Sequence, residues 1–421
     1  GQKDFARLVH YADQAGAHVL FVGDRHQLHA VPAGKPWVVV QAYGLPTTEL
    51  HDNLRQLDPG ERRAVDETKR GRYAKSLQTL TELGKVIVDS SPVELVARLA
   101  KEWQSQNRMG IRPIVGVVTH RARLAVNEAI RTERRQANTL QGPELQATIL
   151  EPTQWTRAQT RSAISYAGHE RSLTVRFQRD YRSLGVKRGE YGRVTNVEEE
   201  IGRITLDVSG RTLRWTPARM VDVEVYKEQT RSLAKGDWIL MSREQGKFIN
   251  RSQWEVVELD ARSSQTVARS VDGRMARIDL TQIRHWDHAY ARTLHSLQGS
   301  TADRVMLYVE SLNPITRDGK RIDAVLEQIF GAQGFYVGIT RQRAGLTIYT
   351  NDASTMSAAV EKELVKTAAL EGTKELPITP PRGEAGRDRL PDVRYRIPDP
   401  LSRRQSERVI ERGHRLPGRS R

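Results

Sequence analysis

Two patterns of apolar residues alternate along this chain, and together they restrict it to a mixed α/β fold with a β-rich insertion. In the first pattern, a helix-like stretch precedes a short apolar run that ends in polar residues; it recurs at 4–24, 93–119 and 322–350. Such units build a doubly wound parallel sheet, whose ligands lie at the carboxyl ends of the strands. Further helical segments at 59–83 and 121–135 complete the α/β pattern. We therefore expect a parallel sheet covered by helices.

The first of these units predicts one helix and one strand. Residues 4–15 have the spacing of an amphipathic helix that Gly16 ends, and residues 17–24, AHVLFVGD, read as a buried strand.

Residues 172–287 follow the second pattern, in which short alternating β runs are separated by glycine turns. This spacing predicts a small antiparallel barrel, or a pair of barrels, inserted into the α/β domain. Tryptophan side chains in this region either stack on nucleobases or fill barrel cores. Core packing is favoured because each lies in or beside an apolar alternation; the four are Trp215, Trp238, Trp254 and Trp286.

Composition points to a basic protein with a polyanionic partner. The 421 residues contain 67 Lys and Arg against 51 Asp and Glu, a formal net charge of +16, which favours nucleic acid. The alternative is a solubilising surface with a basic tail, but residues 377–421 supply 12 Arg and 6 acids, so the body stays basic without them. The absence of cysteine excludes disulfides and thiolate metal sites and fits a cytoplasmic protein. No apolar run approaches the roughly 20 residues of a membrane span.

Polar residues follow the run at 17–24. Asp24 ends it, and Gln27 supplies an amide that both donates and accepts hydrogen bonds, which suits a sensor of a terminal phosphate and its attacking water. Arg55 is a second candidate phosphate-reading group. A simple turn, and a surface Arg55–Gln56 dipeptide, explain the same residues without function, so neither motif decides alone.

The segment Phe335–Thr350, FYVGITRQRAGLTIYT, carries the most informative arginine. We interpret Arg341, with Thr340 beside it, as lying at the end of a strand-like run and just before a second apolar strand. An arginine on rigid backbone at such a junction suits reaching a nucleotide's terminal phosphate across a cleft.

Two further segments place polar groups beside predicted strands. Thr119 and His120 end one strand, where they suit contacts to nucleic-acid phosphates and bases, although a helix N-cap by Thr119 is an equally good interpretation. The segment 290–310, YARTLHSLQGSTADRVMLYVE, gathers polar groups around a flexible glycine: Thr293, His295, Gln298, Gly299 and Thr301. No partner at metal-ligand spacing accompanies His295, so we predict no metal site.

The order of these motifs is more specific than any one of them. GDxxQL, RQ, TH before a helix, TxHxxQGxT and YVGxTR follow one another from about residue 19 to 350. This order resembles the RecD-like branch of superfamily 1 helicases, most closely the helicase part of conjugative relaxases of the TraI/TrwC type. The resemblance implies two RecA-like domains, an SH3-like β insertion, and ATP-driven 5′→3′ movement on single-stranded DNA.

The resemblance also implies residue roles. Gln27 would be the phosphate sensor, Arg55 a phosphate contact and Arg341 the arginine finger, a group worth on the order of 10³–10⁵ in rate. The implied nucleotide site comprises Gly23, Asp24, Gln27, Arg55, Gln298, Gly299 and Arg341. The implied DNA track comprises Thr119, His120, Thr293, His295 and Thr301, and Gln298 with Gly299 would couple the track to the nucleotide.

One expected element is missing from the sequence. No G-x-x-x-x-G-K-[ST] phosphate loop occurs, and no Asp-Glu pair precedes residues 2–5. We therefore expect ATP and Mg²⁺ to bind only in a longer protein, with none held by this chain alone. This interpretation makes the chain a fragment that does not hydrolyse ATP by itself, with single-stranded DNA, missing N-terminal segments and conjugation machinery as partners.

The expected domain plan follows. Residues 1–52 would be a remnant of a first RecA-like domain, residues 53–171 with 288–370 a second, residues 172–287 the barrel insertion, and residues 371–421 a basic disordered tail. Two alternatives stay open: a non-hydrolysing module that binds single-stranded DNA or a docking partner, and a chain whose only functional element is the tail.

Overall fold

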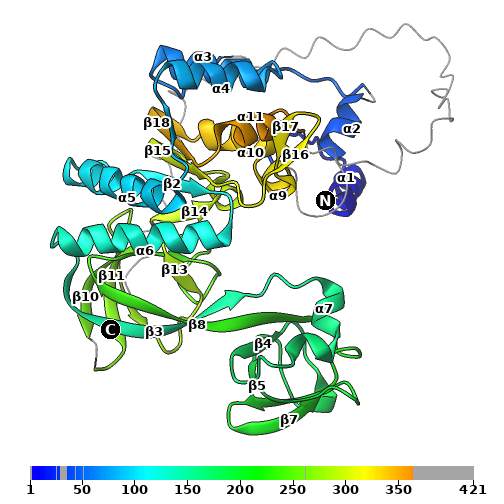
Figure 1. Cartoon of the computed structure of the whole chain (residues 1–421). Helices are drawn as coiled ribbons and strands as arrows, with labels where there is room; N and C mark the ends of the chain where they lie inside the picture. The colour runs from blue at the N-terminus through cyan, green and yellow to red at the C-terminus, as the bar shows by residue number, and fades with distance from the viewer. Residues whose placement is uncertain are drawn as a thin grey trace, which may run out of the picture. The chain divides into compact units, whose positions relative to one another are not determined.

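A five-stranded parallel sheet lies at the centre of the α/β region (Figure 1). The computed structural model describes residues 2–24, 26–28, 36–42, 44–50, 52–260 and 262–363. The sheet has the order β1-β18-β15-β2-β14, and every pair in it is parallel. Its strands are β1 (Val86–Val88), β2 (Ile114–Val117), β14 (Ala291–Thr293), β15 (Ala302–Val309) and β18 (Gln342–Thr350). The mixed α/β fold with a parallel sheet is confirmed.

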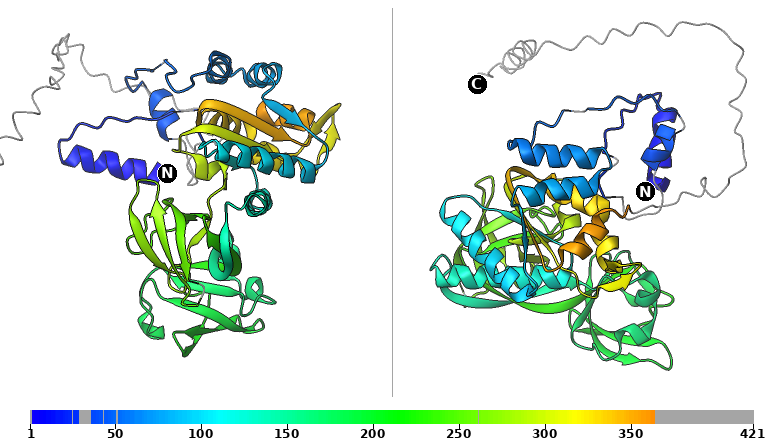
Figure 2. Two further views of the ribbon diagram at one scale, coloured as in Figure 1. Left: turned by 90° about the vertical axis from the view of Figure 1, so that its left-hand side faces the viewer. Right: turned by 45° about the horizontal axis from the view of Figure 1, so that its top comes forward.

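Helices cover both faces of this sheet, which explains the nearly continuous apolar strands. Alternate side chains of β15 show the division, since Leu307 packs with one set of helices and Tyr308 with the other. In the left view of Figure 2, the blue helices α3 and α4 lie on one side of the sheet and the cyan α5 on the other. The first face carries α3 (Pro59–Lys69), α4 (Tyr73–Glu82), α8 (Leu294–Leu297), α9 (Ala324–Ile329), α10 (Gly331–Ile339) and α11 (Ala353–Val360). The second carries α5 (Pro92–Arg108) and α6 (His120–Gln136).

The helix at the N-terminus is confirmed, but the strand predicted after it is wrong. Helix α1 (Gln2–Gln14) ends before Gly16, which has a φ of +60°. Residues 17–24 adopt no regular structure, and Leu20 and Val22 are 87% and 88% exposed. An apolar run becomes a buried strand only when neighbouring strands pair with its backbone, and the described residues before β1 form none. Helix α2 (Pro36–Ala42) follows.

The run before Arg341 is also a helix, not a strand. Residues 331–339 form α10, and all nine are buried. A helix that is apolar on every side shows no helical period, so its sequence cannot be told from a buried strand. Gly338 permits close packing, because a Cβ there would lie 2.7 Å from Leu307 Cδ1 of β15.

The β-rich region forms two open antiparallel sheets rather than a closed barrel. Neither strand order among the described residues closes on itself. The six-stranded sheet has the order β3-β8-β4-β5-β6-β7, from β3 (Gln141–Pro152), β4 (Leu173–Phe177), β5 (Tyr191–Glu198), β6 (Arg203–Val208), β7 (Arg211–Trp215) and β8 (Val223–Lys235). The five-stranded sheet has the order β12-β11-β10-β9-β13, from β9 (Trp238–Met241), β10 (Gln253–Asp260), β11 (Gln265–Ser270), β12 (Met275–Asp279) and β13 (Trp286–His288). The expected barrel is therefore corrected to two open sheets.

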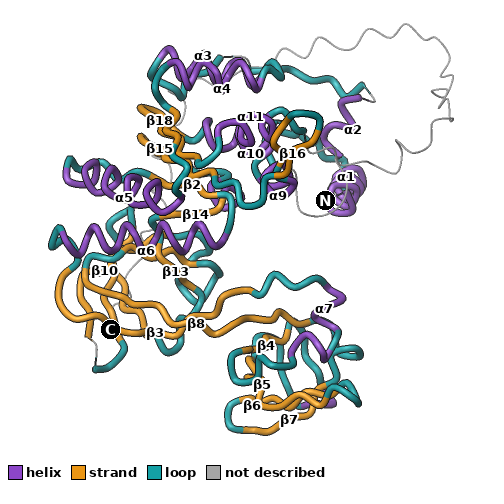
Figure 3. The backbone as a smooth tube through the Cα atoms, in the orientation of Figure 1, coloured by secondary structure: helices purple, strands orange, loops and turns teal. Residues whose placement is uncertain are grey.

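The long strands β3 and β8 connect these two sheets (Figure 3). One end of β8 packs through Val225 into the core of the six-stranded sheet, and the other packs through Leu233 against the five-stranded sheet. Because β3 begins at Gln141, antiparallel pairing starts well before residue 172. Short elements complete the region and the rest of the chain: α7 (Arg157–Arg161), the 3₁₀ turns Ala163–Tyr166 and Arg182–Leu184, and the hairpin of β16 (Ile315–Arg317) with β17 (Lys320–Ile322).

Three of the four tryptophans predicted to pack in cores are buried, as the apolar alternation indicates. Trp215, Trp254 and Trp286 are 0%, 6% and 1% exposed. Trp238 is half-buried, and the guanidinium carbon of Arg112 lies 3.6 Å from its ring centroid.

A buried polar network joins α6 to the turn between β8 and β9. Asp237 is fully buried and accepts hydrogen bonds from Arg131 Nε and Nη2, both at 3.1 Å. It also accepts from the Tyr290 hydroxyl and the Ala234 backbone N–H, both at 2.7 Å, and Arg134 Nη1 donates to the same hydroxyl at 2.7 Å. Burial alone would raise the pKa of Asp237, but His288 and Arg131 outweigh it and lower the pKa. The carboxylate is therefore ionised and saturated with donors.

Candidate functional site

Five of the predicted site residues, from four distant segments, meet at the amino-terminal edge of the parallel sheet. Arg341 directly precedes β18, and Gln298 lies in the short connection that leads into β15. Asp24 and Gln27 come from the irregular segment after α1, and Arg55 from the segment before α3. We call these five residues the Arg341 cluster.

Asp24 is the centre of the hydrogen bonds in this cluster. Its carboxylate accepts from the Tyr336 hydroxyl at 2.8 Å and from Gln27 Nε2 at 3.2 Å. Gln298 Nε2 in turn donates to Gln27 Oε1 at 3.4 Å. The amide of Gln27 thus connects the N-terminal segment to the residues that lead into β15.

The arginines of the cluster have backbone and hydroxyl partners rather than carboxylates. Arg341 is 3% exposed; its Nε donates to Val337 O and its Nη2 to Thr340 Oγ1, both at 3.0 Å. The exposed Arg55 donates from Nη1 to Thr340 O at 2.8 Å. Within the described part of the chain, neither guanidinium is within ion-pair distance of a carboxylate.

The electrostatics of the cluster favour an anion. Burial lowers the pKa of Arg341, the charge of Arg55 lowers it further, and Tyr336 and Asp24 counter only part of this. Two guanidinium groups therefore face one carboxylate. Bringing a phosphate to such a pair offsets the cost of holding Arg341 out of water.

The two glycines of the predicted nucleotide site differ in backbone conformation and surroundings. Gly299 has a φ of +88°, which favours glycine, and it lies next to Gln298 of the cluster. Gly23 is exposed beside Asp24, and a Cβ there would lie 3.5 Å from Trp37 Cε2.

Tyr336 and Gln56 are cluster neighbours to which the sequence assigned no role. Gln56 is buried and donates from Nε2 to Gln342 O at 2.7 Å, which fixes the backbone around Arg341. Both belong to motifs that the sequence does identify, YVGxTR and RQ, but only the fold shows that Tyr336 bonds Asp24 and that Gln56 bonds the backbone on either side of Arg341.

The predicted DNA residues fall at two different edges of the sheet. Thr119 and Thr293 lie together at the carboxyl edge, since Thr293 ends β14 in register with Val117 of β2. Thr119 Oγ1 accepts from the Ala122 N–H at 3.1 Å, so the helix N-cap interpretation is confirmed. The exposed Thr301 directly precedes β15 and so lies at the opposite, amino-terminal edge.

His120 and His295 are the imidazoles of this region. His295 is exposed within α8, which begins directly after Thr293. His120 begins α6, and its Nε2 accepts a hydrogen bond from Gln154 Nε2. Partial burial and then Arg123 lower the pKa of His120, so its ring is neutral near pH 7.

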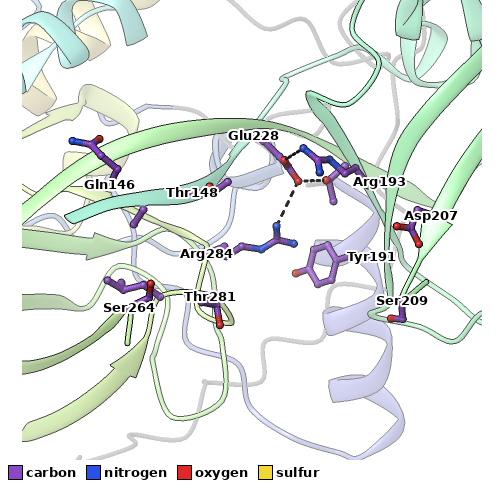
Figure 4. A pocket seen from close by; sticks show the side chains of 13 residues that line it. Gln146, Thr148, Tyr191, Arg193, Asp207, Ser209, Glu228, Ser264, Thr281 and Arg284 are labelled. Carbon is purple, nitrogen blue, oxygen red and sulfur yellow. Dashed lines mark hydrogen bonds and ion pairs between the residues drawn. The ribbon is translucent and has the colours of Figure 1, made fainter. Parts of the chain in front are cut away.

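Among the described residues, those of the antiparallel region line a larger and a smaller pocket. The larger, about 600 Å³, opens between the two sheets (Figure 4). Its cations are already paired, because Arg193 and Arg284 contact Glu228 at 3.1 and 3.5 Å. The smaller, about 360 Å³, is lined by Gln154, Trp155, Tyr226 and His285 among others.

Two negative findings hold for the described part of the chain. It contains no group of three or more His, Asp or Glu side chains placed to hold a metal ion. None of its helices is long and apolar enough to cross a membrane.

Comparison with known proteins agrees with the motif order. The family model of an AAA domain matches residues 1–91. The chain is 22% identical over 415 residues to the multifunctional conjugation protein TraI of Escherichia coli (strain K12). The aligned region covers 88% of this chain and 22% of TraI. The chain is therefore similar in sequence to TraI over most of its own length. It spans about a fifth of the length of TraI.

Solved structures of Pif1 helicases also match. The Bacteroides Pif1 in complex with ADP-AlF3 and ssDNA is 15% identical, with 85% of this chain and 66% of that chain covered and a TM-score of 0.29. The Candida albicans Pif1 is 13% identical, with coverages of 74% and 57% and a TM-score of 0.26. At these TM-scores the likeness carries no argument about the site.

Proposed function

We propose that this chain is the nucleotide-sensing and DNA-contacting part of an ATP-dependent helicase that moves 5′→3′ along single-stranded DNA, as in conjugative relaxases. The observation that carries the proposal is the Arg341 cluster. Residues as far apart as Asp24 and Arg341 meet there, and two arginines without carboxylate partners among the described residues face one acid. The relationship to TraI supports the same function.

The residues present fit one side of a nucleotide site. Gln27 would orient the attacking water, and Arg341 and Arg55 would contact the terminal phosphate, with Arg341 stabilising the charge that develops during transfer. Thr340 keeps the Arg341 fork in place through its hydroxyl. The sequence lacks the phosphate loop, so ATP and Mg²⁺, which supply the transferred phosphoryl group and its counter-charge, would be held together with a further segment of a longer protein.

The domain roles are part of the proposal. Residues 53–171 with 288–370 would be the second RecA-like motor domain, and residues 1–52 a remnant of the first. The antiparallel region would be the counterpart of the SH3-like insertion, although its sheets are open. The residues predicted to form the tail lie outside the described residues. A cytoplasmic location with conjugation machinery as a partner is also proposed.

Hydrolysis in a longer form of the protein tests the motor function. Joining the chain to an N-terminal segment that carries a phosphate loop should give ATP hydrolysis stimulated by single-stranded DNA, and Arg341→Ala should abolish it. Equal hydrolysis by that variant would show that Arg341 is not the arginine finger.

The second candidate function is a DNA-binding module without hydrolysis. The net charge of +16 favours it, because neutralising phosphates releases counterions and makes affinity depend on salt. Titrating the chain with a single-stranded oligonucleotide at several salt concentrations measures this dependence. If the chain does not bind at low salt, the DNA-binding module is excluded. Deleting residues 377–421 shows whether the tail or the rest of the chain binds DNA. If the affinity for the oligonucleotide is unchanged, the DNA-binding site lies outside the tail.

A further inference from the structure

The smaller pocket of the antiparallel region begins where β3 ends. Its walls come from the residues after β3, from the start of β8, and from the loops before β10 and β13. We call it the Trp155 pocket. Gln154 at its rim has a φ of +56°, an uncommon conformation for a residue other than glycine and one that recurs at functional sites.

Three rings belong to its lining: the half-buried Trp155 and the buried Tyr226 and His285. Trp155 is half-buried and packs edge-on against Tyr166, with ring centroids 4.8 Å apart, which leaves part of the indole at the pocket. Tyr226 and His285 meet edge to face at 4.7 Å. Burial and then Arg243 lower the pKa of His285 to about 4, so its ring is neutral near pH 7.

The one arginine of the lining does not supply a free charge. Arg243 Nη1 pairs with Glu224 and donates to the Tyr226 hydroxyl at 2.6 Å. Because this cation is neutralised, the pocket has no strong attraction for a phosphate. An uncharged, planar ligand suits it better.

Several hydrogen-bonding groups of the lining remain available. Within the described residues, the Trp155 indole N–H, Gln154 Oε1 and the Ser242 hydroxyl have no protein partner, and all three residues are partly or fully exposed. Together they offer a donor, an acceptor and a group that does both. A nucleobase edge carries donors and acceptors of this kind beside a π-face that stacks on aromatic rings.

The pocket adjoins the predicted DNA track. Gln154 Nε2 donates to His120, the neighbour of Thr119, and Thr119 and Thr293 lie at the same sheet edge. A strand that follows these residues would reach the pocket directly after His120.

We propose that the Trp155 pocket takes an unpaired nucleobase of single-stranded DNA as the strand passes His120. This inference rests on the proposed DNA-binding function and adds to it a site for a base rather than for the backbone. It predicts that the chain distinguishes DNA with bases from a strand of the same charge without them.

The test compares an oligothymidylate with an abasic oligomer of equal length by fluorescence anisotropy at fixed salt. The unchanged chain should bind the oligothymidylate about tenfold more tightly, the scale of one base stacked on an aromatic side chain. Trp155→Leu and Gln154→Ala should reduce that preference and leave the abasic affinity unchanged. Gln146→Ala, a matched change on β3 at the larger pocket, should keep the preference.

The possible outcomes test the pocket proposal separately from the proposed DNA-binding function. Salt-dependent binding of both oligomers with equal affinity, or a preference that survives in Trp155→Leu and Gln154→Ala, would overturn the pocket proposal and leave DNA binding intact. Gln154→Ala removes an exposed side chain and its hydrogen bond to His120 and touches no core, so it decides the question if Trp155→Leu fails to fold. No binding of either oligomer would overturn both proposals.

Discussion

Changing Asp237 to asparagine should destabilise the connection between the parallel sheet and the antiparallel region. The substitution preserves shape but removes the charge that Arg131, itself 3% exposed, faces at 3.1 Å. It also turns an amide N–H₂ toward donors, because Oδ2 accepts from both Arg131 Nη2 and the Ala234 N–H. Arg131 would retain Glu144, at 2.9 Å, as its main counter-charge.

Breaking a buried ion pair in this way costs about 3–5 kcal/mol. Urea unfolding followed by circular dichroism measures the free energy of unfolding of Asp237→Asn. Asp303→Asn, at an exposed aspartate of β15, is the matched control and should stay within about 0.5 kcal/mol of the parent.

A double-mutant cycle shows whether the loss comes from the pair. Adding Arg131→Met to Asp237→Asn removes the stranded charge, so the double variant should lose at least about 1 kcal/mol less than the sum of the single changes. A loss below about 1 kcal/mol for Asp237→Asn alone, or strict additivity, would refute the reasoning.

Two further predictions concern stability, one at the buried Asp287 and one at Gly116. Burial alone would raise the pKa of Asp287, but Arg123 and Arg231 outweigh it and hold the pKa at about 2, against 3.8 for the free side chain. The resulting stability, about 2 kcal/mol, is present above pH 4 and lost as the pH falls toward 2, so unfolding titrations should show a shallower acid loss in Asp287→Asn. Gly116→Ala should cost about 1–3 kcal/mol in urea unfolding, because the new Cβ would lie 2.5 Å from Leu297 and 2.8 Å from Leu307, both fully buried; a stability equal to the parent would contradict this packing.

The sequence predicted the general fold because its parallel strands are apolar on both faces, and the helices between them have clear periods and caps. Its two errors about single elements have one physical origin. Residues 17–24 and 331–339 are apolar runs without a period, and whether such a run becomes strand, helix or neither depends on what pairs with its backbone. The open ends of the antiparallel sheets are likewise a matter of long-range pairing.

The site was partly predictable. Motif order indicated Asp24, Gln27, Arg55, Gln298 and Arg341, and the structure brings them together. The contact between His120 and Gln154 was not predictable, because the two residues lie in different elements with no shared motif. Thr301 was grouped with Thr119 by motif order, but the structure places it at the opposite edge of the sheet, and its motif gives no sign of this.

The most direct test of the account asks whether Arg341 transmits the nucleotide state to the DNA track. The measurement is the affinity for single-stranded DNA of the longer, phosphate-loop-containing protein, with ADP and with a non-hydrolysable ATP analogue. We expect the two affinities to differ by about 5- to 150-fold, the usual range of coupling between sites. Arg341→Ala should remove the difference, and Arg343→Ala, at an exposed arginine two residues away, should keep it. A difference that persists unchanged in Arg341→Ala would contradict the account.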